Sequence, residues 1–217
     1  MIDLCINELH SLDLKVNIKK STSIRIGKYF KKDCVKILVD GLTIPWMNTI
    51  TYLGVVLKSA LKLSLELKPA RAKFYRAFNS LYSKISKANE YLITTLVGTF
   101  CVPVIMFSLE AFELNASTLS AIDFPMYCAM SKIFKTVDHN VLGWCMFYMN
   151  VLPLKYIYYC KKIRFLTKLK KTKNDLLSYM YNLFGKVELE KTFNQLHIND
   201  SQCVKTSLNK LFENSLF

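Results

Sequence analysis

Asn17 and Lys20 are the first residues of this chain whose types and spacing could support chemistry at a phosphate group. Asn17 lies near the end of the alternating segment 15–19, and Lys20 lies in the polar turn that follows. A lysine beside a nucleotide can neutralise or protonate a departing pyrophosphate, because its ammonium group is a compact positive charge with three donors. The alternative is an ordinary exposed turn lysine, and the residues by themselves favour that alternative.

No further catalytic set stands beside Lys20 in the sequence. A metal-dependent nucleotidyl transferase needs two carboxylates that hold two Mg²⁺ ions, but no Asp-Asp pair occurs in the 217 residues. The 6 glycines lie too far apart for a phosphate-binding loop. The 7 cysteines lack the spacing of a zinc site. From the residues we therefore expect no metal, no cofactor and no independent catalysis in this chain.

Two aromatic side chains near Gly54 could stack on the bases of a nucleic-acid strand, and these are Trp46 and Tyr52. The alternative is a hairpin that packs its aromatic rings on adjacent helices, and we consider this arrangement the more common one. Upstream of both rings, residues 29–33 form a basic loop.

Two segments with helical periodicity carry the candidate phosphate contacts. At about 100° per residue, one stripe of the first segment is apolar: Phe74, Phe78, Leu81 and Ile85. A separate face of the same segment carries Lys73, Arg76, Lys84 and Lys87. The second segment, residues 155–173, contributes Lys161, Lys162, Arg164 and Lys168. Both sets could bind phosphates through counterion release, and a merely solvated face is the equally weighted alternative.

The charge balance favours a polyanionic partner. The chain has 30 Lys and Arg against 16 Asp and Glu, a formal net charge of +14, which points to nucleic acid or to an acidic membrane face. A basic surface that serves only solubility is the alternative. Because 52% of the residues are hydrophobic, the chain can bury a substantial core and is not expected to be globally disordered.

Residues 91–109 are uncharged and nearly as long as a bilayer-spanning helix. They include proline, glycine and several hydroxyl residues, and acidic Glu90 and Glu110 flank them where Lys or Arg would be usual on one side. We therefore expect a buried helix rather than a transmembrane helix.

There is no signal-peptide pattern after Met1, and scattered cysteines suggest reduced, mostly buried thiols. An intracellular protein, nuclear or cytoplasmic, is expected.

The elements that must position these residues change type along the chain. Residues 2–12 have the spacing of an amphipathic helix, and residues 15–19 and 23–27 alternate like half-buried strands. Residues 35–44 predict a hairpin around an Asp-Gly turn. Residues 49–57 predict a strand in which Gly54 marks a bulge or a close backbone approach.

Helices are expected over most of the remaining chain, at 69–85, at 92–112 with a kink at Pro103, at 120–135 and at 155–173. The last segment, 176–217, is polar and is expected to be weakly helical and loosely attached. We therefore predict an α+β fold. A small antiparallel β-sheet and hairpin region occupies 1–58, a helical bundle occupies 59–175, and a polar helical tail occupies 176–217.

With these residues in view, the chain resembles the C-terminal part of the reverse transcriptase of non-LTR (LINE-type) retrotransposons. Segment 8–21 (ELHSLDLKVNIKKS) is similar to the family's palm segment with its N-x-x-K-[ST] turn, although Asp13 stands where the family usually has glycine. The I-P-W at 44–46, followed by YLGV at 52–55, is similar to the family's primer-grip hairpin. Segments 72–85 and 101–111 resemble the thumb, so the likeness extends from about residue 2 to 170.

The resemblance implies a palm remnant over 1–58 and a helical thumb over 59–175 that holds the template–primer duplex. Lys20, three residues after Asn17, matches the palm lysine that is thought to assist pyrophosphate departure. The primer grip, a tight hairpin that brings backbone close to the 3′ end of the primer, would comprise Trp46, Tyr52, Leu53, Gly54 and Val55.

The family's two carboxylate motifs, including an aromatic-x-Asp-Asp turn, are expected upstream of residue 1, because Met1 falls in the helix that follows that turn. We therefore expect a truncated fragment of an RNA-directed DNA polymerase that is inactive alone and binds an RNA–DNA hybrid or other nucleic acid weakly and in a salt-sensitive manner. Mg²⁺ is expected only for the full-length polymerase. A palm cut through its sheet would leave strand edges unpaired and favour aggregation. The alternative is a basic helical interaction protein or membrane-surface protein without enzymatic activity.

Overall fold

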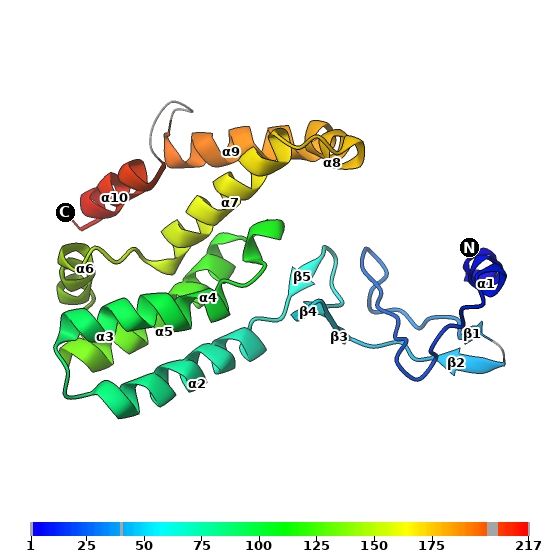
Figure 1. Ribbon diagram of the computed structural model, residues 1–217, viewed down its shortest axis with the longest axis horizontal. Coiled ribbons are helices and arrows are strands. Elements are labelled where there is room, and N and C mark those ends of the chain that lie inside the picture. The colour runs from blue at the N-terminus through cyan, green and yellow to red at the C-terminus, as the bar shows by residue number, and fades with distance from the viewer. Residues whose placement is uncertain (1, 40, 199–203, 217) are drawn as a thin grey trace. The chain divides into compact units, whose positions relative to one another are not determined.

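The computed structural model describes residues 2–39, 41–198 and 204–216. The chain divides into two compact units, Met1–Pro69 (unit 1) and Ala70–Phe217 (unit 2). Strands occur in unit 1 and a series of helices forms unit 2 (Figure 1). The predicted α+β class, with a small antiparallel sheet region ahead of the helices, is therefore confirmed. The division between the units falls later in the chain than the predicted boundary at 58/59.

Unit 1 begins with the predicted amphipathic helix, α1 (Ile2–Ser11). The strands predicted at 15–19 and 23–27 are wrong, because neither segment enters a named strand. At the first, the Lys20 N–H donates to the side-chain oxygen of Asn17 at 3.2 Å, so a local turn replaces a sheet ladder. At the second, Ser23 alone makes an isolated parallel bridge to Trp46.

Two antiparallel sheets follow in unit 1. The predicted Asp-Gly hairpin is confirmed as β1 (Ile37–Val39) paired with β2 (Leu42–Ile44); its Asp40 lies outside the described residues. The second sheet has the order β3–β4–β5, formed by β3 (Thr49–Tyr52), β4 (Val55–Lys58) and β5 (Ser64–Leu65).

Gly54 has a different role from the predicted bulge within one strand. Tyr52 pairs with Val55, so Leu53 and Gly54 are the two residues of a tight turn between β3 and β4. Both have positive φ, 47° and 82°. Two consecutive positive φ values are the requirement of a type I′ hairpin turn, and glycine meets it without steric cost. The glycine thus reverses the chain instead of widening a strand.

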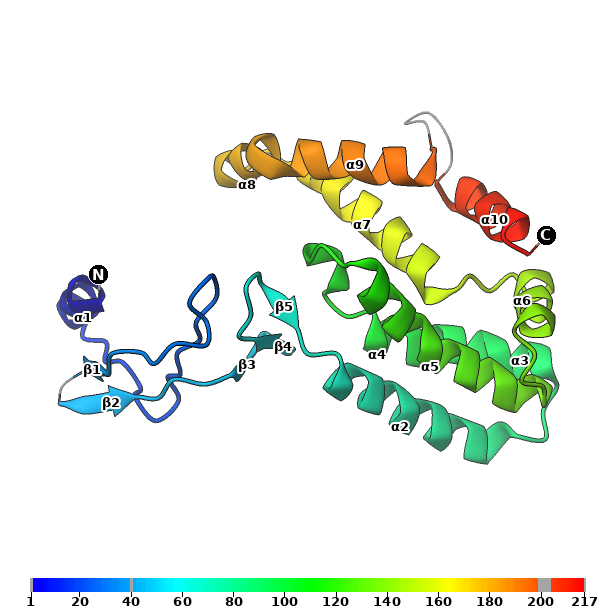
Figure 2. The same cartoon turned by 180° about the vertical axis from the view of Figure 1, so that it is seen from behind.

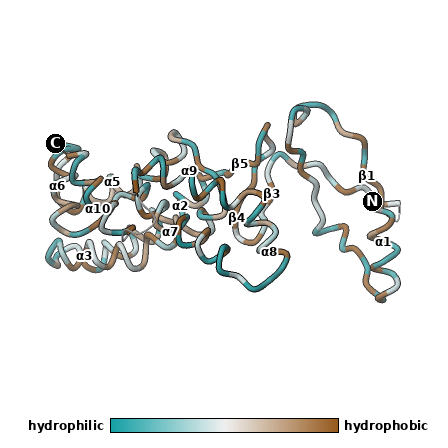
Figure 3. The backbone as a smooth tube through the Cα atoms, turned by 90° about the horizontal axis from the view of Figure 1, so that it is seen from above, coloured by the Kyte–Doolittle hydropathy of each residue, from teal (hydrophilic) through white to brown (hydrophobic). Residues whose placement is uncertain are grey.

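Unit 1 has a thin core. Among its described residues only Val39, Ile44 and Ser59 are buried. Hydrophobic and hydrophilic residues alternate along the trace (Figure 3), but two- to four-residue strands provide few facing positions for the apolar ones.

Unit 2 is built from helices whose bounds are α2 (Lys68–Ile85), α3 (Glu90–Leu96), the π-helix η1 (Val97–Cys101), α4 (Val102–Ile105), the 3₁₀-helix η2 (Leu109–Ala111), α5 (Ala116–Phe134), α6 (His139–Tyr148), α7 (Leu154–Lys170), α8 (Asp175–Met180), the π-helix η3 (Tyr181–Gly185), α9 (Lys186–Leu196) and α10 (Val204–Asn214). Asn or Asp side chains accept backbone N–H groups at the start of α3, α5, α6 and α8, which is the usual means of capping a helix. Helix α5 packs against α3, α6 and α7.

The helix predicted over 92–112 is shorter than expected. Helical backbone runs from α3 through η1 to Ile105, and Ser108 then adopts a left-handed conformation with φ of 58°. The π-helical turn ends at Cys101, two residues before Pro103, whose ring nitrogen cannot donate to the preceding turn. No helix in the described part of the chain is both long enough and apolar enough to cross a membrane.

The C-terminal segment is packed, so its predicted loose attachment is wrong for the described residues. Leu208 and Phe212 of α10 are buried, and the Phe212 ring lies 5.9 Å from that of Tyr156 on α7. Helices α8 and α9, joined by η3, form a nearly continuous rod across α7 (Figure 2). The expectation that most cysteine thiols are buried is also wrong for the described residues, because Cys101 is the only buried cysteine among them.

Asp123 links α5 to the start of α7, and its Oδ1 accepts the Lys155 N–H at 2.9 Å. The first-turn N–H groups of a helix have no partner within that helix, so Asp123 acts as a cap supplied by another helix. Desolvation raises the pKa of this carboxyl above its ordinary value of 3.8, although the contact with Lys155 opposes the shift.

Substitutions of Asp123 should separate its two effects on stability. Asp123→Ala is expected to lower the free energy of unfolding by about 1–2 kcal/mol, because the Lys155 N–H loses its acceptor. The folded-state pKa of Asp123 is raised, so the protonated carboxyl contributes to the free energy of unfolding. This contribution is fully present below the ordinary pKa and is lost as pH rises through the folded-state pKa. Asp123→Asn keeps an acceptor and should abolish this pH-dependent contribution. Urea unfolding across acidic and neutral pH measures both, and an Asn variant with the wild-type pH slope would contradict the assignment.

Candidate nucleic-acid interface

The β3–β4 hairpin presents most of the residues predicted to form a primer grip. Tyr52 and Leu53 are 63% and 77% exposed, and Gly54 beside them is also exposed. Val55 is half-buried as the first residue of β4. The turn therefore offers an aromatic ring, an apolar side chain and open backbone at one tip, an arrangement that can contact a strand without a deep cleft.

Trp46, the fifth of these residues, is held within unit 1. Its indole Nε1 donates to the Val35 carbonyl at 2.9 Å, and the Arg25 guanidinium lies 5.6 Å from the ring centroid. The ring is still 37% exposed. The edge of the indole is therefore anchored to the segment that precedes β1.

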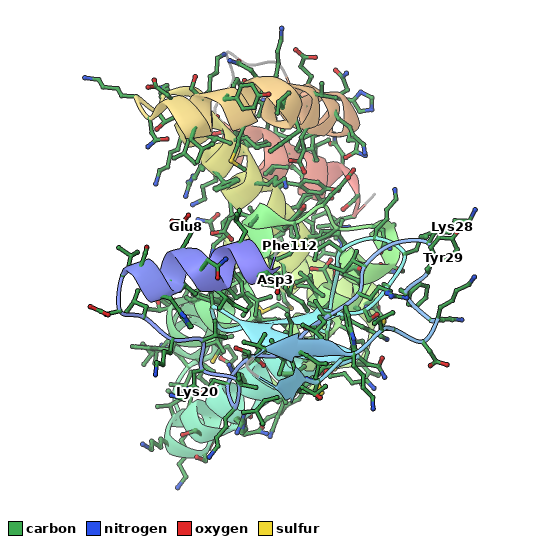
Figure 4. The ribbon with its side chains drawn as sticks, turned by 90° about the vertical axis from the view of Figure 1, so that its right-hand side faces the viewer. Asp3, Glu8, Lys20, Lys28, Tyr29 and Phe112 are labelled. Atoms are coloured by element: carbon green, nitrogen blue, oxygen red, sulfur yellow. The ribbon has the colours of Figure 1, made fainter. Side chains whose placement is uncertain are left out.

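Asn17 and Lys20 form a local turn on the surface of unit 1. Asn17 accepts the Lys20 N–H through both its side-chain oxygen and its carbonyl, at 3.2 and 3.1 Å. The Lys20 side chain is exposed (Figure 4). Asn17 thus positions the backbone of Lys20, and the ammonium group is left accessible to an anion.

The basic face of α2 has the predicted form. Phe74 and Phe78 are buried, and Lys73, Arg76 and Lys84 are exposed on the other side of the helix. Lys87, also exposed, follows the end of the helix. Helix α2 contains no acidic residue, so a phosphate backbone approaching this face meets no opposing carboxylate from α2 itself.

Lys132 on α5 adds a cation to α2 that sequence spacing did not select. Its Nζ lies 3.5 Å from the Asn79 side-chain oxygen and 5.0 Å from the centre of the Tyr82 ring. The Tyr82 hydroxyl in turn donates to the Lys132 carbonyl at 3.3 Å. Lys132 lies 53 positions after Asn79 and 50 positions after Tyr82 in the sequence. Periodicity within a single helix therefore carries no signal of their proximity.

The second basic set, on α7, does not form one surface. Arg164 and Lys168 are exposed and Lys161 is half-buried. Lys162 is 3% exposed, its Nζ lies 2.6 Å from the Glu188 carboxylate of α9, and it donates to the Phe112 carbonyl at 3.1 Å. The prediction that Lys162 contacts nucleic acid is therefore wrong, because its charge is already paired inside unit 2.

A basic and aromatic loop in unit 1 is a further candidate, and it overlaps the basic segment 29–33. It includes Lys28, Tyr29, Lys31 and Lys32, and Lys28 and Tyr29 lie together on it (Figure 4). The signal was present in the order of residues, since cations flank two adjacent aromatic rings at 28–32. Sequence alone does not show what the loop folds against.

Within the described residues, no group of three or more His, Cys, Asp or Glu side chains is arranged to hold a metal ion. Comparison of the chain with protein-family models, curated proteins and solved structures gave no match.

Proposed function

We propose that this chain is a segment of a retrotransposon-type RNA-directed DNA polymerase that contacts a template–primer duplex and does not polymerise by itself. The observation that carries the proposal is the β3–β4 hairpin, in which YLGV forms a tight turn with Tyr52 and Leu53 exposed at its tip. A turn with little side-chain bulk at Gly54 suits close approach of a primer end.

The basic face of α2 supports the same proposal. It offers three exposed cations, Lys73, Arg76 and Lys84, and exposed Lys87 follows the end of the helix. Such a set of cations neutralises phosphates regardless of base sequence. The lack of an Asp-Asp pair in these 217 residues supports inactivity in isolation. Duplex binding should therefore be sequence-independent and should weaken steeply as salt is raised.

Primer extension and hybrid binding by the purified chain test the two parts separately. With an RNA template, a DNA primer, Mg²⁺ and nucleotides we expect no extension, and extension would overturn the inactivity. For binding, Tyr52→Ala with Leu53→Ala should weaken hybrid affinity about fivefold through lost contact at the hairpin tip. The matched control is Leu38→Ala with Leu42→Ala on β1 and β2, where both leucines are 59% exposed. Equal losses, or binding that is insensitive to salt, would reject the hairpin and duplex assignments.

A membrane-surface function is the second candidate, and one feature of unit 2 favours it. Leu176, Tyr179, Met180, Leu183, Phe184 and Val187 recur at helical spacing through α8, η3 and the start of α9, and all are exposed. Lys171, Lys173 and Lys186 lie next to this row and are exposed as well. An apolar row flanked by lysines is the composition of a helix that lies in an anionic lipid interface. Flotation with phosphatidylserine vesicles, in the absence of hybrid binding, would favour this candidate.

A further inference from the structure

A groove in unit 1 lies outside the hairpin tip and the α2 face. It encloses about 530 Å³, and its lining includes Arg25, Lys31, Lys32, Trp46, Asn48 and Lys58. A neighbouring hollow of about 470 Å³ shares Arg25 and Lys32 and adds Lys28 and Tyr29. Among the described residues, Asp33 is the one acidic residue that lines either cavity. Both hollows are therefore strongly positive.

Arg25 gives the loop a defined shape. One of its guanidinium nitrogens, Nη1, donates to the carbonyls of Tyr29 and Lys32 at 3.2 and 3.3 Å, and the group also lies against Trp46. The Arg25 carbonyl accepts the Ser59 hydroxyl at 2.7 Å, which ties the start of the loop to the chain after β4. The loop is thus organised before any ligand arrives, which lowers the entropic cost of binding.

The loop lysines outnumber the acidic residue beside them, Asp33, and make no ion pair within the described residues. In the described part of the chain the ion pairs are Lys162 with Glu188 and Lys191 with Glu113, and neither involves this loop. The Lys32 ammonium lies instead 4.7 Å from the centre of the Tyr29 ring, with Lys28 at 5.8 Å from the same ring. Tyr29 is 54% exposed. Cations therefore surround an accessible aromatic face.

We propose that the groove and the neighbouring hollow, which share Arg25 and Lys32, together bind an unpaired stretch of nucleic acid. Lys31 and Lys32 contact its phosphates, and Tyr29 stacks on one of its bases. Exposed aromatic rings among cations are the two elements that single-strand binding requires. A duplex keeps its bases stacked on one another and cannot use Tyr29 in this way, and an acidic peptide offers no flat ring to stack. The site shares no residue with the basic face of α2, so it adds a second mode of nucleic-acid contact.

Anisotropy of a labelled oligouridylate with the whole chain tests this proposal. Lys31→Ala with Lys32→Ala should weaken binding at least about tenfold and reduce the log–log salt slope by about 1.4, the value for two lost phosphate contacts on a single strand. The matched control, Lys15→Ala with Lys62→Ala, makes the same charge change at exposed lysines that line neither cavity, and it should change affinity less than about twofold. Equal losses in both variants would overturn the site.

Stacking is tested at Tyr29. Tyr29→Leu should lose about tenfold in affinity, whereas Tyr29→Phe should bind as the wild type does, and circular dichroism should show both variants folded. A Leu variant that binds normally, or a polyglutamate that competes as well as the oligouridylate, would overturn the assignment to nucleic acid. If Lys73→Glu with Lys84→Glu on α2 loses hybrid binding and retains oligouridylate binding, the two sites succeed or fail independently.

Discussion

Lys162→Ala is expected to lower the free energy of unfolding by about 3 kcal/mol, the low end for breaking a buried ion pair. Lys162 is almost fully buried, and its ammonium contacts both the Glu188 carboxylate at 2.6 Å and the Phe112 carbonyl at 3.1 Å. Glu188 is 26% exposed, so water can solvate part of the carboxylate that is left behind. That partial exposure keeps the expected loss from being larger.

The Phe112 carbonyl retains a second partner in this variant. Tyr158, one turn before Lys162 on α7, donates its hydroxyl to the same oxygen at 2.8 Å. Burial raises the pKa of Tyr158 to about 12, so the hydroxyl stays protonated at neutral pH. The loss in Lys162→Ala should therefore come from the Glu188 pair and from lost packing of the lysine stem, and not from an unsatisfied carbonyl.

Urea denaturation of a short series of variants measures this effect. Lys161→Ala, beside Lys162 but with no ion pair in the described residues, should change stability by less than about 0.5 kcal/mol. Lys162→Met with Glu188→Leu should recover much of the loss, because apolar side chains of similar volume often replace a buried pair without cost. If Lys161→Ala destabilises the chain as much as Lys162→Ala does, the Glu188 pair is not the cause.

Lys73→Glu with Lys84→Glu should weaken binding of an RNA–DNA hybrid at least about a hundredfold at low salt. Two phosphate contacts disappear, which should reduce the log–log salt slope by about 1.8, and two new carboxylates repel the backbone. Both lysines are exposed on α2, away from buried Phe74 and Phe78. Thermal unfolding should therefore change little, and the loss should be one of affinity.

The control for charge alone is Lys15→Glu with Lys62→Glu, an identical change at exposed lysines of unit 1. It should lower hybrid affinity far less, because neither lysine belongs to the basic face of α2. Anisotropy across a salt series measures both variants. If hybrid binding survives the α2 change, Arg164 and Lys168 on α7 become the better candidates; if the control falls equally, no local site exists.

The helices were predictable because their signals are local. Phe74, Phe78, Leu81 and Ile85 recur at helical spacing, and α2 buries that side. Helix α7 runs from Leu154 to Lys170, within two residues of the predicted start and three of the predicted end. Polar caps such as Asn115, which accepts the Thr118 N–H at 2.8 Å, are also readable from sequence. The strand predicted over residues 15–19 is absent because the Asn17 side-chain oxygen accepts the Lys20 N–H, which forms a local turn instead.

The candidate site was only partly predictable, because a charge pattern does not show which charges are already paired. By itself, the sequence determined the helices, the Asp-Gly hairpin and the basic face of α2, since each depends on neighbours within a few residues. Only the tertiary structure decided that Lys162 is buried against Glu188, that Lys132 reaches α2 and that Arg25 closes a loop against Trp46. Those contacts join residues 21 to 53 positions apart. No local periodicity encodes them, because they arise when separate elements pack.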